Sequence, residues 1–578
     1  MTRSSFRLRS LSAAVLWVLG FSCLLAASAN AVFLGLSTRL GGSGADSIRD
    51  VTTDAAGNLY VTGSTTSTDF AGLATSPNGT DVFVAKLDPT GQRILYLELF
   101  GGDGFEEAWA IEVDAAGNAH VAGYTASSTF PTRSGYDAVV DGTDLFLLKL
   151  DPNGDLLYGT VYGGPDADGE FNGGIGIHGP SGRVYVGSRA DSTGLPTLNA
   201  FSPYCPAAPC AFVVGFDPAQ SGNASLVYAS YVTAPDALAN QEDGGLLDLD
   251  VDASENLYAF GFVNPNAQVV LAGQGFQDAS GDPNNNDHVL VKLDPSQSGA
   301  AQRVYSTFLG GFGDESERGR IAALDSGIVF VGSKTDSDAG TFPVLNAVQP
   351  NNAGGEDGYV AKIDTTIAGA GSQLFTTFLG STENDEIHAI AVDGAGEPWV
   401  AATVGGDAAV LFPQVQPLPG SPRAGEDDDA VVAWLAGDGS AIRFSSATAA
   451  GGASSLQGLA VQPSGRVVVA GSRADANFPR RGGLPLAAEG GSEIALVGLD
   501  PTGDLGLVLQ ARATADPART GDLFAFEYLI RNLGSADAAN AVLTTDFPVG
   551  LVSPLASASC SLPGSSATCE LFEDIPRG

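Results

Sequence analysis

Short runs of β-branched and aromatic residues alternate along the chain with compact turn sequences. LYV at 59–61 follows the turn DAAGN at 54–58, and VFVA at 82–85 precedes the turn DPTG at 88–91. In the second turn Pro presets φ and Gly accepts a left-handed backbone, whereas in the first turn Gly57 supplies the positive φ of a short hairpin loop. Helical 3.6-residue periodicity is absent outside the N-terminal segment. The pattern therefore predicts β-hairpins along the chain.

Two hairpin units recur in a fixed order. The unit typified by TDAAGNLYVTG from Thr53 precedes the unit DVFVAKLDPTG from Asp81, and each unit occurs seven times. Their strands are apolar on both faces, as in sheets that stack around a propeller axis, rather than alternating as in a sheet with one solvated face. Further copies of the first unit start at Val113, His178, Val251, Leu324, Val392 and Val461, and those of the second start at Asp144, Ala211, Asp287, Asp357, Asp429 and Glu493.

A third recurrent strand, which usually ends in Gly-Gly, is out of phase with the hairpins. Its first copy, LSTRLGG from Leu36, lies ahead of the first hairpin, and its second copy is ILYLELFGG from Ile94. Two hairpins per repeat give four strands, so we expect seven four-stranded blades. An N-terminal strand would then complete the last blade and remove the unpaired edges of an open ring.

The combined pattern, STFLGG followed by A-x-D-x-x-G-N-x-Y-V-x-G and D-x-F-V-x-K-L-D-P-x-G, resembles the SBBP β-propeller repeat of exported bacterial proteins. The resemblance covers residues 36 to 503. The third copy (175–216) and the sixth copy (373–439) depart most, with insertions and lost Gly or Lys. The resemblance implies an all-β, seven-bladed propeller over residues 32–503 and implies no established chemistry.

The pattern changes after residue 503. Alternation is visible in FAFEYLI at 524–530, and NLG at 532–534 makes a turn. The segment is similar to the Ig-like repeat of bacterial surface proteins, with Tyr528 at that family's strand tyrosine. The similarity implies an Ig-like β-sandwich over residues 504–578. Such domains usually run somewhat longer, so we expect this one to be truncated or followed by further modules.

The N-terminus has the layout of a secretory signal peptide. Arg3, Arg7 and Arg9 precede the apolar run at 11–27, and Ala29-Asn30-Ala31 supplies a small-x-small cleavage site. We expect cleavage after Ala31, so that residues 1–31 are absent from the exported chain. An uncleaved anchor is the alternative, because 17 apolar residues approach the length of a membrane span.

The charge of the chain excludes several partners. Only 27 Lys and Arg face 66 Asp and Glu, for a formal charge of −39. Nucleic-acid binding needs basic side chains, so no nucleic acid is expected, nor insertion of the mature chain into a membrane. Export predicts a secreted, periplasmic or cell-surface protein.

The cysteine pattern agrees with an oxidising compartment. Outside the signal segment four cysteines remain, in two close pairs. Four cysteines allow three pairings, and proximity favours the two local bridges over a zinc site. The expected pairs are Cys205 with Cys210 and Cys560 with Cys569.

Candidate chemistry is sparse. Two loops place side-chain oxygens at the spacing that calcium takes, without the full EF-hand pattern, and a solvated loop tip is the alternative. The four histidines (His120, His178, His288 and His388) are spread over different copies, with no nucleophile–base spacing. No cofactor is required and no catalytic residue is predicted. The calcium candidates are Asp282, Asn284, Asn286 and Asp287 in one loop, and Asp166, Asp168 and Glu170 in the other.

These observations favour an exported binding or scaffold protein whose propeller presents a surface to an extracellular protein or glycan. One alternative is a secreted carbohydrate-active enzyme, a lyase or hydrolase, with carboxylates in the propeller funnel. Another is a segment of a larger multi-module adhesin. Inward-facing Asp, Arg and Tyr at the channel mouth would favour the enzyme, and additional Ig-like copies would favour the adhesin.

Overall fold

The chain divides into two compact units, Leu34–Gly498 and a second unit formed by Met1–Phe33 with Leu499–Gly578. Among the residues that the structure describes there is no α-helix, and hence no helix of the length and hydropathy needed to cross a bilayer. The computed structural model describes residues 2–8, 32–72, 79–170, 172–205, 208–232, 244–264, 269–315, 318–405, 412–415, 417–418, 429–448, 454–473, 493–500, 507–513, 525–532, 542–546, 554–556, 560–561 and 566–570.

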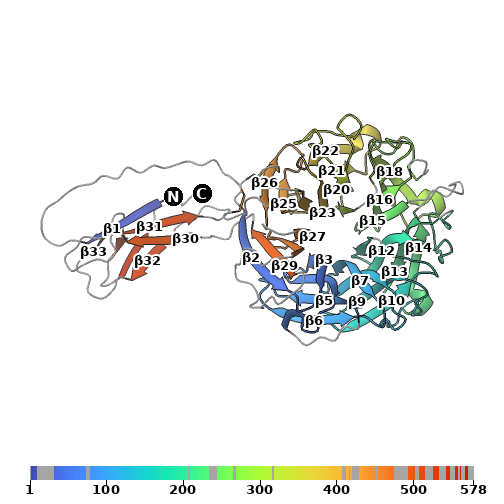
Figure 1. The fold of residues 1–578 in the computed structure, drawn as a ribbon, viewed down its shortest axis with the longest axis horizontal. Coiled ribbons are helices and arrows are strands. Elements are labelled where there is room, and N and C mark those ends of the chain that lie inside the picture. Colours follow the sequence, from blue (N-terminus) through green and yellow to red (C-terminus); the bar gives the residue numbers. More distant parts are fainter. Residues whose placement is uncertain are drawn as a thin grey trace. The chain divides into compact units, whose positions relative to one another are not determined.

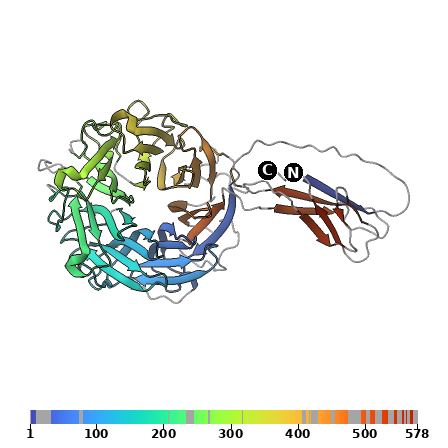
Figure 2. The same ribbon diagram turned by 180° about the vertical axis from the view of Figure 1, so that it is seen from behind.

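The larger unit is a seven-bladed β-propeller, as the repeat count predicts. Seven four-stranded antiparallel sheets surround a central channel (Figures 1 and 2). The first strand of each blade lies innermost. Blades 1 to 3 consist of β3 (Asp46–Thr53), β4 (Leu59–Thr65), β5 (Asp81–Leu87) and β6 (Ile94–Phe100); β7 (Glu106–Val113), β8 (Ala119–Thr125), β9 (Asp144–Leu150) and β10 (Leu156–Tyr162); and β11 (Gly174–His178), β12 (Arg183–Ala190), β13 (Cys210–Phe216) and β14 (Leu226–Tyr231).

The remaining blades follow the same order, and the third and sixth copies form complete four-stranded sheets despite their irregular sequences. Blades 4 to 7 consist of β15 (Gly244–Val251), β16 (Leu257–Val263), β17 (Asp287–Leu293) and β18 (Arg303–Leu309); β19 (Gly319–Ala323), β20 (Ile328–Thr335), β21 (Asp357–Asp364) and β22 (Gln373–Leu379); β23 (Asp385–Val392), β24 (Pro398–Val404), β25 (Asp429–Leu435) and β26 (Ile442–Ala447); and β27 (Ser454–Val461), β28 (Val467–Arg473) and β29 (Glu493–Asp500) with β2 (Phe33–Leu40). Short 3-10 turns lie at η1 (Phe70–Gly72), η2 (Gly222–Ser225), η3 (Gly299–Gln302) and η4 (Gly369–Ser372).

Blade 7 closes the ring with a strand from the start of the chain. Its strand order is β2-β29-β28-β27, so β2 is the outer strand beside β29. The phase of the Gly-Gly strand predicted this arrangement, and the structure confirms it. Closure joins segments that are more than 450 residues apart in sequence and leaves no open end in the ring of blades.

The hairpin turns have the predicted backbone. Gly57 and Gly91 adopt φ of 81° and 63°, the left-handed region that glycine accepts without strain. In the first turn the Asp54 carboxylate accepts hydrogen bonds from the Asn58 amide (2.9 Å) and the Asn58 side chain (2.7 Å). Tyr60, on the next strand, donates its hydroxyl to the same carboxylate (3.1 Å). The D-x-x-G-N-x-Y motif is therefore a single local hydrogen-bond cluster.

The lysine of the K-L-D-P motif packs against this cluster. Lys86 of β5 lies 3.8 Å from the Asp54 carboxylate and over the Tyr60 ring, 4.8 Å from its centre. In blade 2 Lys149 lies 3.1 Å from Asp114, and the His120 ring stands where blade 1 has tyrosine. Both repeat units of a blade are thus joined by an ion pair at one end of the sheet, which gives these motif residues structural roles.

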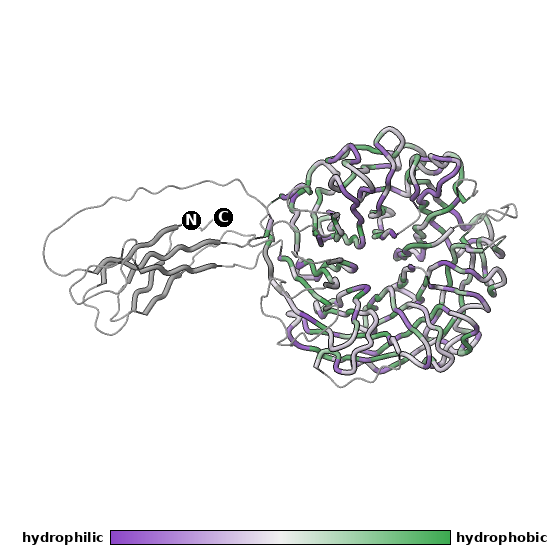
Figure 3. The backbone as a smooth tube through the Cα atoms, viewed as in Figure 1, coloured by the Kyte–Doolittle hydropathy of each residue, from purple (hydrophilic) through white to green (hydrophobic). Residues whose placement is uncertain are grey.

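Packing between blades buries both faces of the sheets. Every residue of β5 and of β16 is buried. The core clusters extend from one blade to the next: one of them joins Trp109 of blade 2 to Val186 and Phe212 of blade 3. Figure 3 shows apolar stretches in all parts of the ring. The uninterrupted apolar character of the strands follows from this stacking.

The smaller unit is also built of strands. β30 (Leu507–Ala513), β31 (Ala525–Asn532), β1 (Thr2–Leu8) and β33 (Pro554–Ala556) form one sheet, and β32 (Val542–Asp546), β35 (Ser566–Glu570) and β34 (Cys560–Ser561) form another. An Ig-like sandwich stays a prediction. In the structure β1 pairs with β31, so cleavage of the predicted signal peptide would remove β1.

Candidate functional site: the central channel

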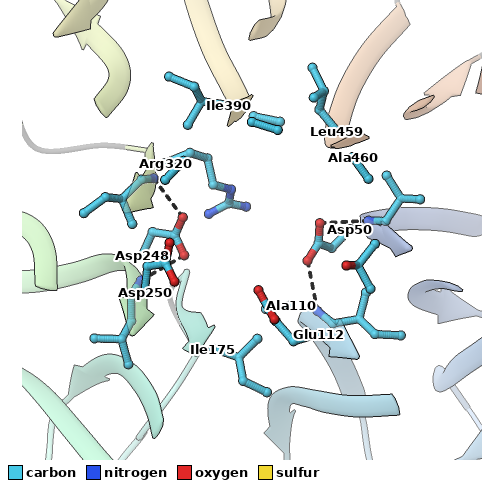
Figure 4. A pocket seen from close by; sticks show the side chains of 18 of the residues that line it. Asp50, Ala110, Glu112, Ile175, Asp248, Asp250, Arg320, Ile390, Leu459 and Ala460 are labelled. Carbon is cyan, nitrogen blue, oxygen red and sulfur yellow. Dashed lines mark hydrogen bonds between the residues drawn. The ribbon is translucent and has the colours of Figure 1, made fainter. Parts of the chain in front are cut away.

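The innermost strands enclose a cavity of about 380 Å³ on the propeller axis. Figure 4 shows carboxylates and one guanidinium turned into it, with aliphatic side chains on the remaining wall. The blades contribute unequally, since blades 1, 2, 4 and 5 supply the charges and blades 3, 6 and 7 supply apolar groups. The charged residues are Asp50, Glu112, Asp248, Asp250 and Arg320, and the apolar ones include Ile175, Ile390, Leu459 and Ala460.

Two of the aspartates tether neighbouring blades. The Asp50 carboxylate accepts hydrogen bonds from the amide of Val51 (2.8 Å) in its own strand and from the amide of Ile111 (2.9 Å) in blade 2. Asp248 of blade 4 likewise accepts from the Ile321 amide of blade 5 (3.0 Å). These carboxylates satisfy backbone donors where two inner strands meet, which is a structural role.

Asp250 makes a third tether, to the Ala323 amide (2.7 Å). These side chains are half-buried, because the channel admits water while the blades displace most of the bulk solvent. The surrounding protein raises the pKa of Asp50 to about 7 and that of Asp250 to about 7. Burial also raises the pKa of Asp248 to about 6, with the Arg320 guanidinium opposing the rise. Burial thus shifts the pKa of all three channel aspartates from the acidic range towards neutrality.

Glu112 and Arg320 are the two remaining charged residues of the channel. Among the residues that the structure describes, Glu112 has no hydrogen-bond or ion-pair partner. Burial and the neighbouring Asp250, Asp50 and Asp248 raise its pKa well above the usual value. The Arg320 guanidinium projects into the cavity (Figure 4), and its contacts with the Leu247 and Gly319 carbonyls are long, at 3.4 and 3.5 Å. Both groups are available to a ligand.

A β-bulge in the inner strand aims further side chains toward the axis or the rim. In blade 2 the pairing of β7 with β8 skips Trp109, which lies between Ala108 and Ala110. A bulge re-aims the extra side chain, and the identity of that residue changes from blade to blade. Sequence reasoning missed this position because no turn residue marks it. The bulged residues are Arg49, Trp109, Leu247, His388 and Gln457.

A second feature that sequence reasoning missed is a pair of carboxyl groups between neighbouring blades. The aspartate that opens the third strand of one blade lies beside an acid that opens the first strand of the next blade or shortly precedes it. A Cβ built on Gly380 would fall 2.6 Å from Asp385 Oδ2 and 2.7 Å from Asp357 Oδ1, so the first position of this Gly-Gly or Gly-Ser pair must be glycine. The pairs are Asp81 with Glu106, Asp144 with Asp168, Asp287 with Glu315, and Asp357 with Asp385.

Asp287 shows the setting of such a pair. Asp287 is fully buried and accepts a hydrogen bond from the Gly281 amide (2.7 Å) in the preceding loop, while its Oδ1 has no hydrogen-bond partner in the described part of the chain. It interacts with Glu315, and burial raises the pKa of both acids, that of Glu315 to about 8. We therefore expect the two carboxyl groups to share one proton.

The first calcium candidate loop is closed by its own hydrogen bonds. Asp282 Oδ1 accepts from the Asn284 amide and side chain, both at 2.9 Å. The Asn286 carbonyl accepts from the Glu315 amide (2.9 Å). Asp287 belongs to the carboxyl pair described above.

The second candidate loop is similar. Asp168 is buried and accepts from the amides of Gly164 (2.8 Å) and Ser192 (3.0 Å), and Glu170 accepts from the Thr143 hydroxyl (2.7 Å). The exposed Asp166 donates its amide to the Ser192 hydroxyl (3.2 Å). Across the described ranges no three His, Cys, Asp or Glu side chains are grouped as metal ligands. Calcium binding at either loop stays a prediction.

The cysteines and the histidines have structural settings. Cys205 and Cys210 form a disulfide with Cα atoms 6.1 Å apart. The register of β34 and β35 places Cys560 opposite Cys569, and their bridge stays a prediction. His288 is fully buried between the Tyr359 hydroxyl (2.9 Å) and the Ser333 hydroxyl (3.2 Å).

Comparison with protein families gives one match. The SBBP β-propeller repeat family matches residues 37–71, which span the closing strand β2 and the first hairpin of blade 1. Seven blades built on this pattern agree with a propeller of SBBP-type repeats. A search of curated proteins gave no match.

Solved structures resemble the chain at low identity. A protein of unknown function from Dyadobacter fermentans is 10% identical, with 81% of this chain and 99% of that chain covered and a TM-score of 0.37. Raptor of Chaetomium thermophilum is 9% identical, with 81% and 29% covered and a TM-score of 0.41. A polysaccharide lyase described as an ulvan lyase is 9% identical, with 78% and 97% covered and a TM-score of 0.37. Similarity at this level says nothing about what the chain binds or catalyses.

Proposed function

We propose that the chain is an exported or cell-surface binding protein whose propeller takes part of an extracellular ligand into its central channel. The observation that carries the proposal is that the Glu112 carboxyl and the Arg320 guanidinium both face the cavity, where the Glu112 side chain has no partner among the described residues. A concave site with a few convergent polar groups of perturbed pKa is the usual form of a ligand site.

Export itself is tested by N-terminal sequencing of the secreted protein, which should begin at Val32.

The lining of the channel favours a ligand that has both a positive charge and methylene groups. Four carboxylates and one guanidinium leave an excess of negative charge once the acids ionise, and the aliphatic wall of Ile390 and Leu459 suits a hydrocarbon chain. Amine-bearing sugars, lysine-rich peptides and diamines share this chemistry. A linear diamine is the simplest probe.

Calorimetry of the mature chain with 1,5-diaminopentane tests the proposal, with 1,5-pentanediol as the uncharged control. We expect the diamine to bind and the diol not to bind. Binding should strengthen from pH 5 to pH 8, because carboxyls with raised pKa lose their protons over this range and attract a cation only when ionised. The substitution Glu112→Gln should weaken binding about tenfold, equivalent to about 1.4 kcal/mol.

The matched control is Glu98→Gln, which changes an exposed glutamate on the outer strand β6. Equal binding of diol and diamine, or full binding by Glu112→Gln, would contradict a cation site in the channel.

A carbohydrate-active enzyme, a lyase or hydrolase, is the second candidate. Glu112 favours it, because a carboxyl with a raised pKa keeps the proton that a general acid must donate. Asp and Arg face the channel, but the lining described includes no tyrosine. New reducing ends after incubation with neutral and uronate polysaccharides, lost in Glu112→Gln, would establish this activity.

The C-terminal unit is proposed to be an Ig-like spacer that carries the propeller, alone or within a multi-module adhesin. Its support is the alternating sequence at 524–530 and the antiparallel pairing of β30 with β31. A structure of the isolated segment 504–578 would decide whether its strands pack as a sandwich.

A further inference from the structure

We propose that a second cavity, at one end of blades 5, 6 and 7, binds a sugar unit through hydrogen bonds. We call it the rim pocket. Its volume is about 860 Å³, within the size range of small-molecule sites. Every side chain that lines it is polar, apart from one glycine. The lining residues are Arg318, Glu356, Glu383, Asn384, Asp385, Glu386, His388, Thr403, Gly405, Ser455 and Gln457.

Arg318 organises the pocket across three blades. It precedes β19 and has φ of 39°, a left-handed conformation that a residue with a side chain rarely adopts. Its guanidinium lies 3.1 Å from Glu386 of blade 6 and donates to the Gln457 side chain of blade 7 (3.4 Å). Strained residues held by their surroundings are common at ligand sites. The pocket is thus assembled before a ligand arrives.

His388 supplies a buried polar atom that needs a partner. It is the bulged residue of β23 and only 6% exposed. Its Nε2 lies 2.8 Å from the Thr403 hydroxyl, whereas its Nδ1 has no hydrogen-bond partner within the described chain. Burial, with Arg318 nearby, lowers the pKa of His388 to about 3, so the ring is neutral. An unsatisfied buried group of this kind costs free energy.

The geometry supports binding rather than nucleophilic catalysis. In a catalytic triad the acid orients the ring through the nitrogen that does not face the nucleophile. Here the Glu386 carboxylate is 3.8 Å from Nε2, the same nitrogen that faces Thr403. No orienting acid lies at Nδ1 among the described residues, so His388 and Thr403 lack the third member of a triad.

Two of the four acids that line the pocket are paired with cations. Glu356 pairs with Lys334 (3.1 Å), and Glu386 pairs with Arg318. The buried Asp385 accepts hydrogen bonds from the Ser381 hydroxyl and the Gly405 amide, both at 3.1 Å. Paired charges interspersed with amides and hydroxyls suit a ligand that is rich in hydroxyl groups and uncharged. The described lining holds no aromatic ring, so affinity would rest on hydrogen bonds.

The test is calorimetry of the mature chain with a panel of soluble oligosaccharides: neutral hexose and pentose oligomers, uronate oligomers and glucosamine oligomers. We expect a neutral oligomer to bind, and Arg318→Ala and Gln457→Ala each to raise its dissociation constant at least tenfold. Arg49→Ala is the control, because Arg49 of blade 1 pairs with Glu107, the residue of blade 2 that is equivalent to Glu386, and lies outside the rim pocket. That variant should bind within twofold of the original chain.

Three results would overturn the proposal: no oligosaccharide in the panel binds at millimolar concentration, Arg318→Ala and Gln457→Ala both bind fully, or Arg49→Ala loses as much affinity as Arg318→Ala. Thermal unfolding of each variant separates a lost site from a lost fold. The rim pocket and the channel fail independently, since Glu112→Gln should keep oligosaccharide binding and Arg318→Ala should keep diamine binding.

Discussion

Most charged residues of the repeat motifs are engaged in building blades. Asp54 organises its hairpin turn, Lys86 joins the two units of the blade, and Asp50 tethers one blade to the next. Such groups are buried or half-buried and hydrogen-bonded, and they account for much of the acidity without any ligand. The residues that remain unexplained by assembly, Glu112 in the channel and His388 at the rim, are therefore the informative ones.

The shared proton between Asp287 and Glu315 predicts how stability depends on pH. Their folded pKa values lie above those of the unfolded chain, so the folded state holds more protons, and stability falls as pH rises from about 4 to about 8. Asp287→Asn removes one ionisable partner. We expect it to raise the unfolding midpoint at pH 8 by about 1–3 °C, for about 1 kcal/mol, and to change little at pH 5.

Thermal unfolding at the two pH values measures this effect. Asp282→Asn, in the neighbouring loop, is the control and should show the same small change at both. Equal destabilisation of Asp287→Asn at pH 5 and pH 8 would mean that Asp287 stabilises the fold as an ionised carboxylate. That result would rule out the shared proton.

At the scale of strands and blades, the sequence predicts those features that the residues of a single turn or strand determine. Gly57 and Gly91 mark their turns because only glycine tolerates the positive φ there, and the early Gly-Gly strand sets the phase of closure. The bulges at Trp109 and His388 carry no such mark, since they arise from pairing between strands. The sequence placed carboxylates in the propeller funnel under the enzyme alternative but did not identify them, because Asp50 and Arg320 meet only when separate blades close into a ring.

The bulge explains the glycine at the end of the V-x-G motif and predicts its importance. In blade 2 a Cβ on Gly123 would fall 2.1 Å from the Glu107 carbonyl oxygen beside the bulge and 2.6 Å from the Phe146 ring. Neither the backbone nor the buried ring can move away cheaply. We expect Gly123→Ala to cost about 3 kcal/mol or more in a urea unfolding experiment. Gly244→Ala is the control, since its nearest contact would be an ordinary 3.4 Å, and it should cost under about 1 kcal/mol. Equal stability of the two variants would show that the bulge relaxes.

For the propeller as a whole, closure by β2 gives a structural role to the segment that directly follows the predicted signal peptide. Cleavage after Ala31 would leave Val32 and then the complete closing strand at Phe33–Leu40. Cleavage at this site would therefore leave the closing strand intact, with only Val32 ahead of it. Loss of β2 would expose the edge of β29, whose backbone groups would seek another strand.

A chain that begins at Gly41 tests the closing strand directly. We expect it to unfold at a lower temperature than the chain that begins at Val32, and to self-associate through the free edge of β29, as judged by size-exclusion chromatography. The synthetic peptide VFLGLSTRL, residues 32–40, should restore the monomer and raise the unfolding temperature with increasing peptide concentration, because it binds only the folded ring. A peptide of scrambled sequence should do neither, since register places specific side chains against the blade. If the shortened chain stays monomeric and equally stable, or if both peptides rescue it alike, then the ring is held by blade stacking alone and β2 does not close it.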